Sequence, residues 1–545
     1  MRNLNILITN LILMGSLGLG AQTLTPYLKS STFYPTPPDA VNFCEDYFTD
    51  FAFTATFTAY YSSPTENGFV SIDSSGVVDT INIEPASDNL KPGPILNLGT
   101  TSCLMVIDNE SQVLHISFRD NIQSSETDGY DIDLPVQFNQ AEVLGFVFHT
   151  LFPDNYVVTA AIKAFDTSDN KWKVLVARIV INNLGDTATH EFNTLMVGSF
   201  ATIATNIKID PVGNVFIWGY FQKNAAGSNH DNFLTKYNSF GALQYSKLFF
   251  SYAGRDDIAS QLVIDDLGNL YGISSSEDNV APYYKHISVF KIKALNGKML
   301  WTKRFGEATE GDENMWDAAG NTIGEGIAFT GSYKTGSGGR DIRTWRLSGT
   351  GAILWTKNIN LNLIPGSIEE GRSVCFDIIT GDVLIAGFTL NNVFIERYNT
   401  NTGVAVWPVK LYEGVESGLV INDDMILQSN LTGDDWLLFP SENPGGGCCR
   451  VTAAFFGEHY VRSNISENKN AINLYPNPAS EQFLVEGIPE NVPIQIINTA
   501  GQVVNEMQSM ESVLYVNISE YPTGCYLLRY KNDNTFETIP FVISR

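Results

Sequence analysis

The chain has 545 residues, of which 44% are hydrophobic, and its 33 basic and 59 acidic residues give a formal net charge of −26 at pH 7. This length exceeds what one ordinary hydrophobic core fills, so we expect two or more domains or one large repeat domain. The acidic balance argues against a nucleic-acid partner, because such binding depends on lysine and arginine neutralising phosphates.

The N-terminus has the pattern of a secretory signal peptide over residues 1–21. Arg2 supplies a positive start, an apolar run extends from Leu4 to Leu19, and small residues end at Ala21, where a peptidase would cut. A transmembrane anchor is the alternative, but the run is short for a span of about 20 residues and contains asparagines. We therefore expect an exported mature chain without a transmembrane segment.

Residues 45–460 alternate short β-rich runs with turns rich in Gly, Asn, Asp and Ser. Val215–Phe221 and Asp382–Thr389 are typical runs, and no stretch keeps the 3.6-residue apolar period of a helix. Many short strands at even spacing predict an all-β propeller, barrel or sandwich.

One motif recurs inside this region. Gly297–Lys303 and Gly351–Lys357 are nearly identical, Gly241–Lys247 has Tyr245 in place of tryptophan, and Gly403–Lys410 has one inserted residue. With weaker matches upstream, seven glycines lie 52 to 56 residues apart: Gly76, Gly129, Gly185, Gly241, Gly297, Gly351 and Gly403. A period near fifty residues suits a four-stranded blade, so the repeat predicts a β-propeller of about seven blades.

The aromatic residue of the motif has a structural interpretation. We expect Trp301, Trp355 and Trp407 to occupy equivalent places and to pack between neighbouring blades. The lysine two positions later shares the strand face of the tryptophan. We expect its stem to pack while its amine reaches solvent.

A second mark has the form Asp-x-x-Gly-Asn. It occurs at Asp210–Asn214, Asp265–Asn269 and Asp317–Asn321, and Asp377–Asp382 is a longer variant. An aspartate can accept hydrogen bonds from backbone N–H groups, and glycine or asparagine can adopt positive φ, so the mark predicts hairpin turns. A calcium loop would need more carboxylates at alternating positions.

The two marks, together with the strand Lys236–Asn238, resemble the β-propeller repeats of secreted bacterial proteins over residues 205–410. The phrase Ala294–Trp301 also resembles a blade of quinoprotein dehydrogenases, which carry a vicinal disulfide, and Cys448-Cys449 is a vicinal pair. That pair lies at the end of the predicted propeller, however, and no set of calcium ligands is evident. We therefore predict no cofactor.

The sequence offers few candidates for catalytic residues. None of the six histidines lies in a His-Glu-x-x-His motif, and we interpret His149 as a strand or core residue. Adjacent acidic pairs such as Asp256-Asp257 point to opposite faces of a strand and make poor hydrolase sites. We predict no catalytic, cofactor-binding or metal-binding residue. The expected function is non-enzymatic binding of a protein or polysaccharide, and the alternative is a glycan-active hydrolase or lyase on a propeller scaffold.

The C-terminal region differs in character. Residues 461–470 are polar and form a predicted linker, and residues 471–545 contain strand-like segments, such as Pro493–Asn498, that predict a small β-sandwich. The segment resembles the C-terminal sorting domain of the type IX (Por) secretion system of Bacteroidetes through a motif whose residues are Pro476, Asn477, Pro478, Gly501, Gly524 and Tyr526. Cys525 departs from the usual aliphatic residue. The resemblance implies the type IX secretion machinery as a partner and a secreted or surface-attached product.

The predicted propeller must also close. An open ring leaves unpaired strand edges, so we expect the N-terminal segment, including residues 40–44 and the run from Phe51, to supply a strand to the last blade. Because export is oxidising, Cys44 is a candidate to form a disulfide with Cys448 or Cys449. The alternative is that Cys44 is a buried free thiol.

Overall fold

The computed structural model describes the chain from residue 24 to residue 543 with gaps at loops, the longest at 413–425 and 461–472. Side chains are described for parts of residues 103–406 and 474–543. The predicted signal peptide (1–21) and linker (461–470) lie outside the described residues. The chain divides into two compact units, residues 1–461 and 462–545, and each is considered by itself.

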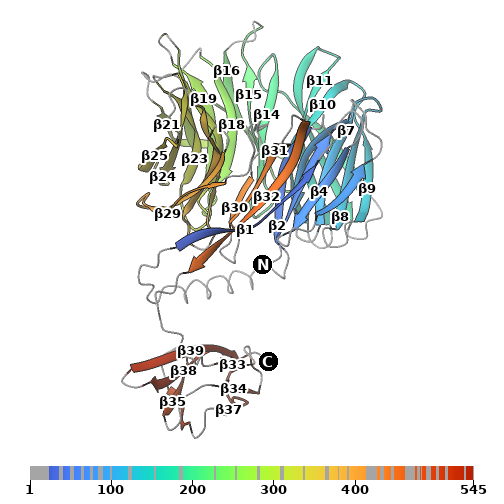
Figure 1. Ribbon diagram of the computed structural model, residues 1–545. Helices are drawn as coiled ribbons and strands as arrows, with labels where there is room; N and C mark the ends of the chain where they lie inside the picture. Colours follow the sequence, from blue (N-terminus) through green and yellow to red (C-terminus); the bar gives the residue numbers. More distant parts are fainter. Residues whose placement is uncertain are drawn as a thin grey trace. The chain divides into compact units, whose positions relative to one another are not determined.

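Within the described residues, the first unit consists of eight four-stranded antiparallel sheets (Figure 1). In seven of them the strand order follows the chain. The first four sheets are β2(Val41–Thr49)–β3(Ala55–Ser62)–β4(Asn67–Asp73)–β5(Val78–Ile83), β6(Leu90–Asn97)–β7(Thr101–Asp108)–β8(Val113–Asp120)–β9(Ser125–Asp133), β10(Phe138–Leu151)–β11(Asn155–Asp166)–β12(Lys171–Asn182)–β13(Ala188–Leu195) and β14(Thr202–Ile209)–β15(Val215–Gln222)–β16(His230–Tyr237)–β17(Leu243–Phe249). The next three are β18(Asp257–Ile264)–β19(Leu270–Glu277)–β20(Lys285–Lys293)–β21(Lys298–Phe305), β22(Glu313–Gly320)–β23(Ile327–Lys334)–β24(Arg340–Leu347)–β25(Ile353–Ile359) and β26(Glu369–Phe376)–β27(Val383–Thr389)–β28(Asn392–Tyr398)–β29(Ala405–Tyr412).

The eighth sheet joins the two ends of the unit. Its order is β1(Leu24–Pro35)–β32(Gly447–Tyr460)–β31(Asp435–Asn443)–β30(Ile426–Ser429). The first strands of successive sheets contact one another, and β30 contacts β2, so the sheets form a closed ring. This arrangement is an all-β propeller, which confirms the predicted fold class.

Closure by the N-terminus is confirmed, but the predicted segment was wrong. The closing strand is β1, which pairs with β32 from Leu24↔Tyr460 to Pro35↔Arg450, whereas residues 41–49 form the first strand of another sheet. The glycine count gave seven blades because the closing sheet takes its outer strand from the other end of the chain. That sheet therefore has no turn between its third and fourth strands where a repeat glycine could lie.

The repeat glycines mostly mark equivalent turns. Gly241, Gly297, Gly351 and Gly403 each lie between the third and fourth strands of a sheet, with φ between 63° and 83°. This left-handed conformation suits glycine and explains its recurrence. Gly129 was aligned wrongly, because it lies inside β9 and pairs with Ser117. Gly76 and Gly185 lie outside the described residues.

The aromatic residues of the repeat also occupy equivalent places. In each of four successive sheets the aromatic residue pairs with a basic residue of the third strand: Tyr245 with Lys236, Trp301 with Lys291, Trp355 with Arg346 and Trp407 with Arg397. The prediction that the three tryptophans are equivalent is therefore confirmed by the strand register.

Residues of these pairs donate hydrogen bonds to the following blade. The Trp301 Nε1–H and the Lys291 amine both donate to the Gly349 carbonyl of the following sheet, at 3.1 and 2.9 Å. The Trp355 Nε1–H likewise donates to the Thr400 carbonyl at 3.0 Å. Lys303 is exposed, and its amine also donates to the Gly351 carbonyl at 2.6 Å, a contact with the next blade that the sequence did not indicate.

The Asp-x-x-Gly-Asn turns are confirmed at two places. Asp210 Oδ1 accepts from the Val212 and Asn214 N–H groups at 3.1 and 2.9 Å, and Asp265 Oδ1 accepts from the Asn269 N–H at 2.9 Å. The carboxylates thus satisfy turn amides, as turn chemistry predicts.

The third of these turns was assigned wrongly. Asp317 lies inside β22 beside a β-bulge, and the hairpin turn begins four residues later, where the Asn321 N–H donates to the Gly326 carbonyl. The Asp317 carboxylate instead accepts from the Val374 N–H at 2.9 Å, and burial raises its pKa. Asp317 follows the bulge of its strand as Asn206 and Gln261 do in the two preceding sheets, and Asn321 takes the place of Asp210 and Asp265. The motif at Asp317 is therefore a coincidence of spacing.

The second unit is a small β-sandwich, as predicted. Within its described residues, a sheet of order β33–β34–β37 and a sheet of order β36–β35–β38–β39 share one core, in which the Phe483 and Phe541 rings lie 4.5 Å apart. The strands are β33(Asn473–Tyr475), β34(Gln482–Glu486), β35(Pro493–Asn498), β36(Val503–Gln508), β37(Val513–Asn517), β38(Gly524–Asn532) and β39(Thr535–Ile543).

Candidate functional site

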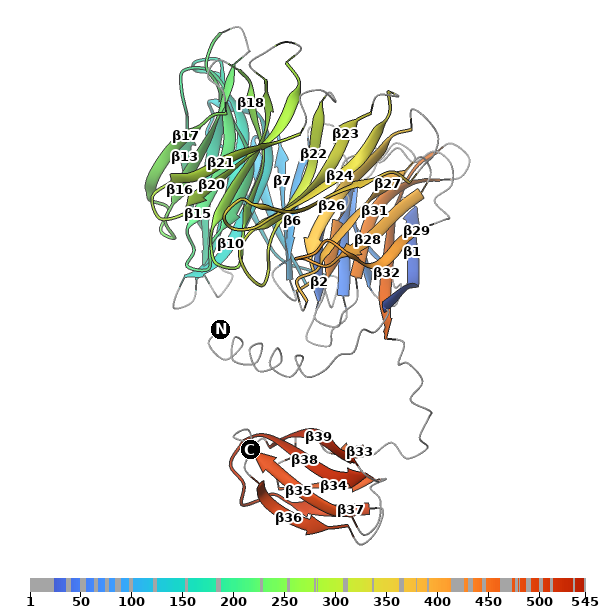
Figure 2. The ribbon, with the colours of Figure 1, turned by 90° about the vertical axis from the view of Figure 1, so that its left-hand side faces the viewer.

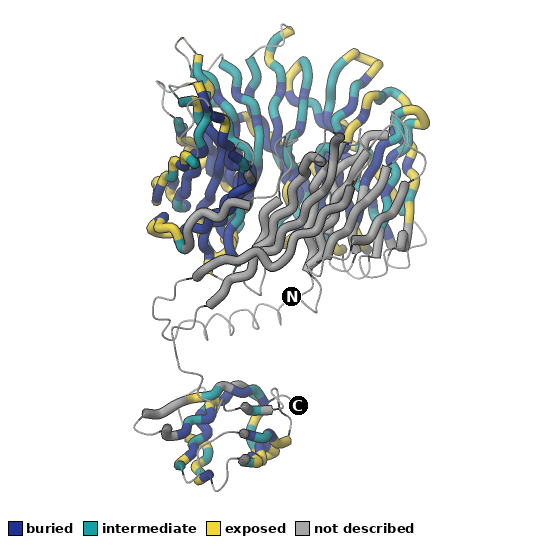
Figure 3. Tube along the Cα trace, in the orientation of Figure 1, coloured by how far each residue is buried: buried dark blue, intermediate teal, exposed yellow. Residues whose placement is uncertain are grey.

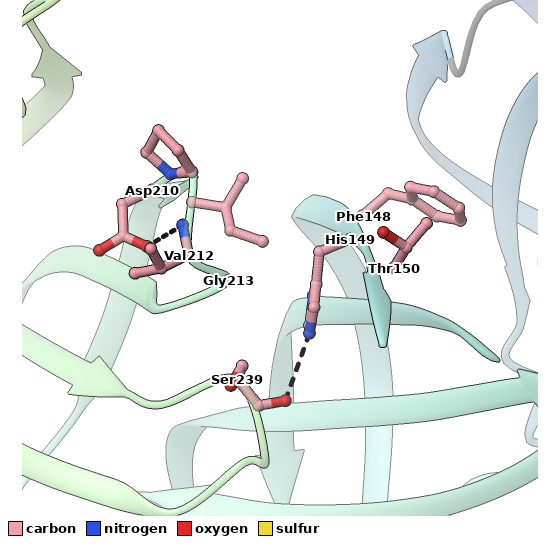
Figure 4. Close-up of a pocket in the computed structure, with 9 residues that line it drawn as sticks. Phe148, His149, Thr150, Asp210, Val212, Gly213 and Ser239 are labelled. Carbon is pink, nitrogen blue, oxygen red and sulfur yellow. Dashed lines mark hydrogen bonds between the residues drawn. The ribbon is translucent and has the colours of Figure 1, made fainter. Parts of the chain in front are cut away.

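A pocket of about 530 Å³ lies between two neighbouring blades, where β10 ends beside the turns of the next sheet (Figure 4). Its residues come from three stretches far apart in the chain, which only the ring brings together. They are Phe148, His149, Thr150, Ile209, Asp210, Pro211, Val212, Gly213 and Ser239.

The β14–β15 turn forms one side of the pocket. Gly213 has a φ of 84°, and a Cβ atom at this position would lie 3.0 Å from both His149 Cδ2 and Ser239 Cβ. Glycine is therefore needed for conformation and for space. The Asp210 carboxylate accepts from two backbone amides and from Asn214 Nδ2, so it is held inside the turn.

The imidazole of His149 forms the opposite side. Its Nε2 lies 3.2 Å from the Ser239 carbonyl oxygen, so the neutral ring has its proton on Nε2 and donates it there. Burial is the main cause that lowers the pKa of His149, and the neighbouring Arg178 lowers it further. His149 is thus a half-buried, hydrogen-bonded strand residue that also lines a pocket.

An aromatic pair borders the pocket on the β10 side. The Phe148 ring, which lines the pocket, stacks on Tyr156 with centroids 5.4 Å apart and an interplanar angle of 27°. The lining therefore combines apolar groups with hydroxyl, imidazole and carbonyl groups. Such a surface can bind an uncharged or weakly polar group by packing and hydrogen bonding.

No reactive cluster accompanies this pocket. Asp210 is the single carboxylate that lines it, and the side chains that the structure describes contain no group of three His, Cys, Asp or Glu that could hold a metal ion. Sequence reasoning could not find the pocket, because His149 and Ser239 are separated by 90 residues. The turn motif at Asp210 was the one available signal, and it indicated only a hairpin.

The acidic pair Asp256-Asp257 is divided between two environments, with Asp256 just before β18 and Asp257 as the first residue of that strand. Asp256 accepts from His230 at 2.9 Å, whereas Asp257 is buried and accepts from the Ser251 N–H at 2.8 Å. Burial is the main cause that raises the pKa of Asp257 to about 6, and the negative charge of Asp231 raises it further. The two carboxylates therefore do not form a hydrolase pair.

We expect Asp257→Asn to change how stability depends on pH. Because the folded pKa lies above the unfolded value of about 3.9, the folded state binds the extra proton between about pH 4 and pH 6, and this contribution is lost as pH rises through 6. Relative to the wild type, the variant should therefore gain about 2 kcal/mol in unfolding free energy between pH 4.5 and pH 7.5. Urea unfolding at both pH values measures this, and a constant difference would contradict it.

The second unit is identified by comparison. Residues 473–544 match the protein family described as "Secretion system C-terminal sorting domain". They form a type IX sorting domain. The chain is therefore secreted or attached to the cell surface, and the sorting domain implies interaction with the type IX secretion machinery.

Propellers are among the solved structures that resemble the chain. "Structure of Dos1 propeller" aligns with a TM-score of 0.50 and 11% identity, over 80% of this chain and 96% of that chain. The WD40 domain of SCAP from fission yeast has a TM-score of 0.44 and 9% identity, over 79% and 98%. PorZ, a surface component of the type IX secretion system of Porphyromonas gingivalis, has a TM-score of 0.19 and 10% identity, over 90% and 91%. At 11% identity the likeness to the Dos1 propeller concerns the fold alone, and the lower TM-scores of the other two support no conclusion. Comparison with curated proteins finds no match.

The motif of the sorting domain is partly described. Tyr526 is buried, stacks on Phe541 and donates from its hydroxyl to the Pro522 carbonyl at 2.9 Å, and Gly524 begins β38. Tyr526 therefore contributes to the core of the sandwich. Pro476, Asn477, Pro478 and Gly501 lie outside the described residues, so their role stays a prediction.

The candidate disulfide also stays a prediction. Cys44 belongs to β2, and Cys448 and Cys449 belong to β32, two strands that contact each other where the ring closes. The side chains of all three lie outside the described ones. Among the elements that the structure describes, no helix is of the length and apolarity needed to cross a membrane.

Proposed function

We propose that the propeller is a non-enzymatic binding module that works outside the cell, where the sorting domain delivers it. The observation that supports this proposal is the pocket of about 530 Å³, built jointly by two blades and lined by apolar and hydrogen-bonding groups. Its one lining carboxylate is occupied by turn amides, so the pocket offers recognition rather than acid–base chemistry. The proposed ligand is an extracellular protein or polysaccharide.

We also propose the division of the chain into a signal peptide (1–21), a propeller (45–460), a linker (461–470) and the sorting domain (471–545). The closing strand β1 adds residues 24–35 to the propeller. A purified chain used for binding experiments should therefore begin close to residue 22.

Two equivalent turn positions provide a matched test. Val212 and Leu267 occupy the same place in successive Asp-x-x-Gly-Asn turns and are both exposed, but only Val212 lines the pocket. We expect Val212→Arg to weaken ligand binding at least tenfold, because the long side chain fills the pocket, and Leu267→Arg to have little effect. The measurement is a glycan array and an extracellular-protein panel, followed by titration of the hits.

Two results would contradict this proposal. Equal loss in Val212→Arg and Leu267→Arg would place the ligand away from the pocket. Cleavage of a bound glycan by the wild-type chain would instead support the alternative, a glycan-active hydrolase or lyase.

A further inference from the structure

An unusual surface lies on the outer edge of three consecutive blades. In the sheets that end with β17, β21 and β25, the fourth strand is the edge strand of its sheet (Figure 2). Seven large apolar side chains on these strands or in the turn before β21 are between 40 and 73% exposed: Leu243, Leu248, Leu295, Met299, Leu300, Ile353 and Leu354. Figure 3 shows exposed positions along these outer strands. We name this surface the outer apolar wall.

The edge strands of the outer apolar wall contact one another's turns from blade to blade. A Cβ atom at Gly297 would lie 2.7 Å from Lys247 Cγ of the preceding sheet, and one at Gly351 would lie 3.0 Å from the Trp301 ring. The Lys303 amine of β21 also donates a hydrogen bond to the Gly351 carbonyl in the turn before β25. Each edge strand therefore touches the turn that begins the next edge strand, so the exposed side chains lie on adjoining strands of neighbouring blades. Clustered exposed apolar side chains mark interaction surfaces.

The charge of the wall is opposite to that of the chain. The sequences of β17, β21 and β25 contain four lysines and one arginine but no aspartate or glutamate. Lys247, Lys298 and Lys303 are exposed. In a chain with 59 acidic and 33 basic residues, this composition makes the wall locally cationic as well as apolar.

Edge protection explains only part of this pattern. Lysines on an edge strand discourage pairing with the edge of another sheet. That role does not require exposed leucine, isoleucine and methionine beside the lysines, because such residues favour association. Apolar side chains interleaved with lysines are typical of surfaces that lie on anionic membranes.

We propose that the outer apolar wall docks on an anionic lipid surface. The apolar side chains enter the head-group region, while the amines of Lys247 and Lys298, on long flexible stems, reach the phosphates. The sorting domain makes the chain secreted or attached to the cell surface, where an anionic lipid surface is available to the propeller. The proposal does not depend on the ligand of the pocket.

Vesicle co-sedimentation of the full chain tests the proposal. We expect binding to vesicles of phosphatidylcholine and phosphatidylglycerol (3:1) that weakens as salt rises, and much weaker binding to phosphatidylcholine alone. Lys247→Gln/Lys298→Gln should lower the partition coefficient about thirtyfold, at about fivefold per lysine near an anionic surface. Lys285→Gln/Lys334→Gln is the matched control, because both lysines are exposed but lie outside the wall.

The apolar part is tested separately by Leu300→Ser/Leu354→Ser, which should also weaken vesicle binding without changing the charge. Equal binding by the wild type and both wall variants would overturn the proposal, and so would equal binding to neutral and anionic vesicles. If Lys247→Gln/Lys298→Gln self-associates in light scattering and still binds vesicles as well as the wild type, the lysines protect the edges and the proposal fails.

Discussion

Trp218→Ala should destabilise the propeller by about 3–5 kcal/mol, the range for removing a large buried aromatic side chain. Trp218 is fully buried between two blades, where its ring lies 5.7 Å from Phe249 and 6.1 Å from Phe290. Its Nε1–H donates to the Ile273 carbonyl of the following sheet at 3.1 Å, so the substitution also leaves a buried acceptor without this donor. The following sheet fits closely, because a Cβ atom at Gly272 would lie 2.7 Å from the Trp218 ring.

The control for this experiment is Trp301→Ala. Trp301 belongs to the repeat motif but is only half-buried, and it makes a comparable hydrogen bond to the next blade, at 3.1 Å. We expect a smaller loss, because less apolar surface is removed from the core. Urea unfolding followed by circular dichroism measures both variants. A loss for Trp218→Ala no larger than that for Trp301→Ala would mean that burial between the blades does not set the cost.

The sequence predicted the repeat because its physical requirements are local. A turn that needs positive φ selects glycine at Gly241 and at the later equivalents, and an aromatic residue that must reach the next blade recurs four positions further on. These requirements act within seven residues, so they appear as a readable motif. The β-sandwich was predictable for the same reason, since its strands alternate locally and its turn residues are conspicuous.

The parts that could not be predicted depend on distant residues. The eighth blade combines β1 with β32, and nothing in the composition of either strand identifies its partner. The pocket depends on His149 meeting Ser239, which requires knowledge of how two blades are placed. Asp317 shows a third kind of failure, in which a local motif is present but the hairpin turn lies four residues later, at Asn321.

Arg397, which no sequence motif indicated, is the second residue whose substitution should strongly destabilise the propeller. Arg397 pairs with Trp407 in strand register, but its guanidinium turns toward the β26–β27 hairpin of its own blade. It lies 3.3 Å from the Asp377 carboxylate and 3.1 Å from that of Asp382, and it donates to Thr380 Oγ1 at 2.8 Å. Arg397 is 1% exposed, so these ion pairs are screened little by water.

Arg397→Met should therefore cost about 3–5 kcal/mol, because it leaves two carboxylates in a buried site without their cation. The cost should arise from the uncompensated charges rather than from the lost volume, since methionine fills much of the same space. The same substitution in an Asp377→Asn/Asp382→Asn background should then cost much less, because the two amide side chains carry no charge and their carbonyl oxygens can still accept from the turn. Thermal and urea unfolding of the four proteins in this cycle measure the coupling. An equal cost of Arg397→Met in both backgrounds would show that packing, and not charge, makes Arg397 necessary.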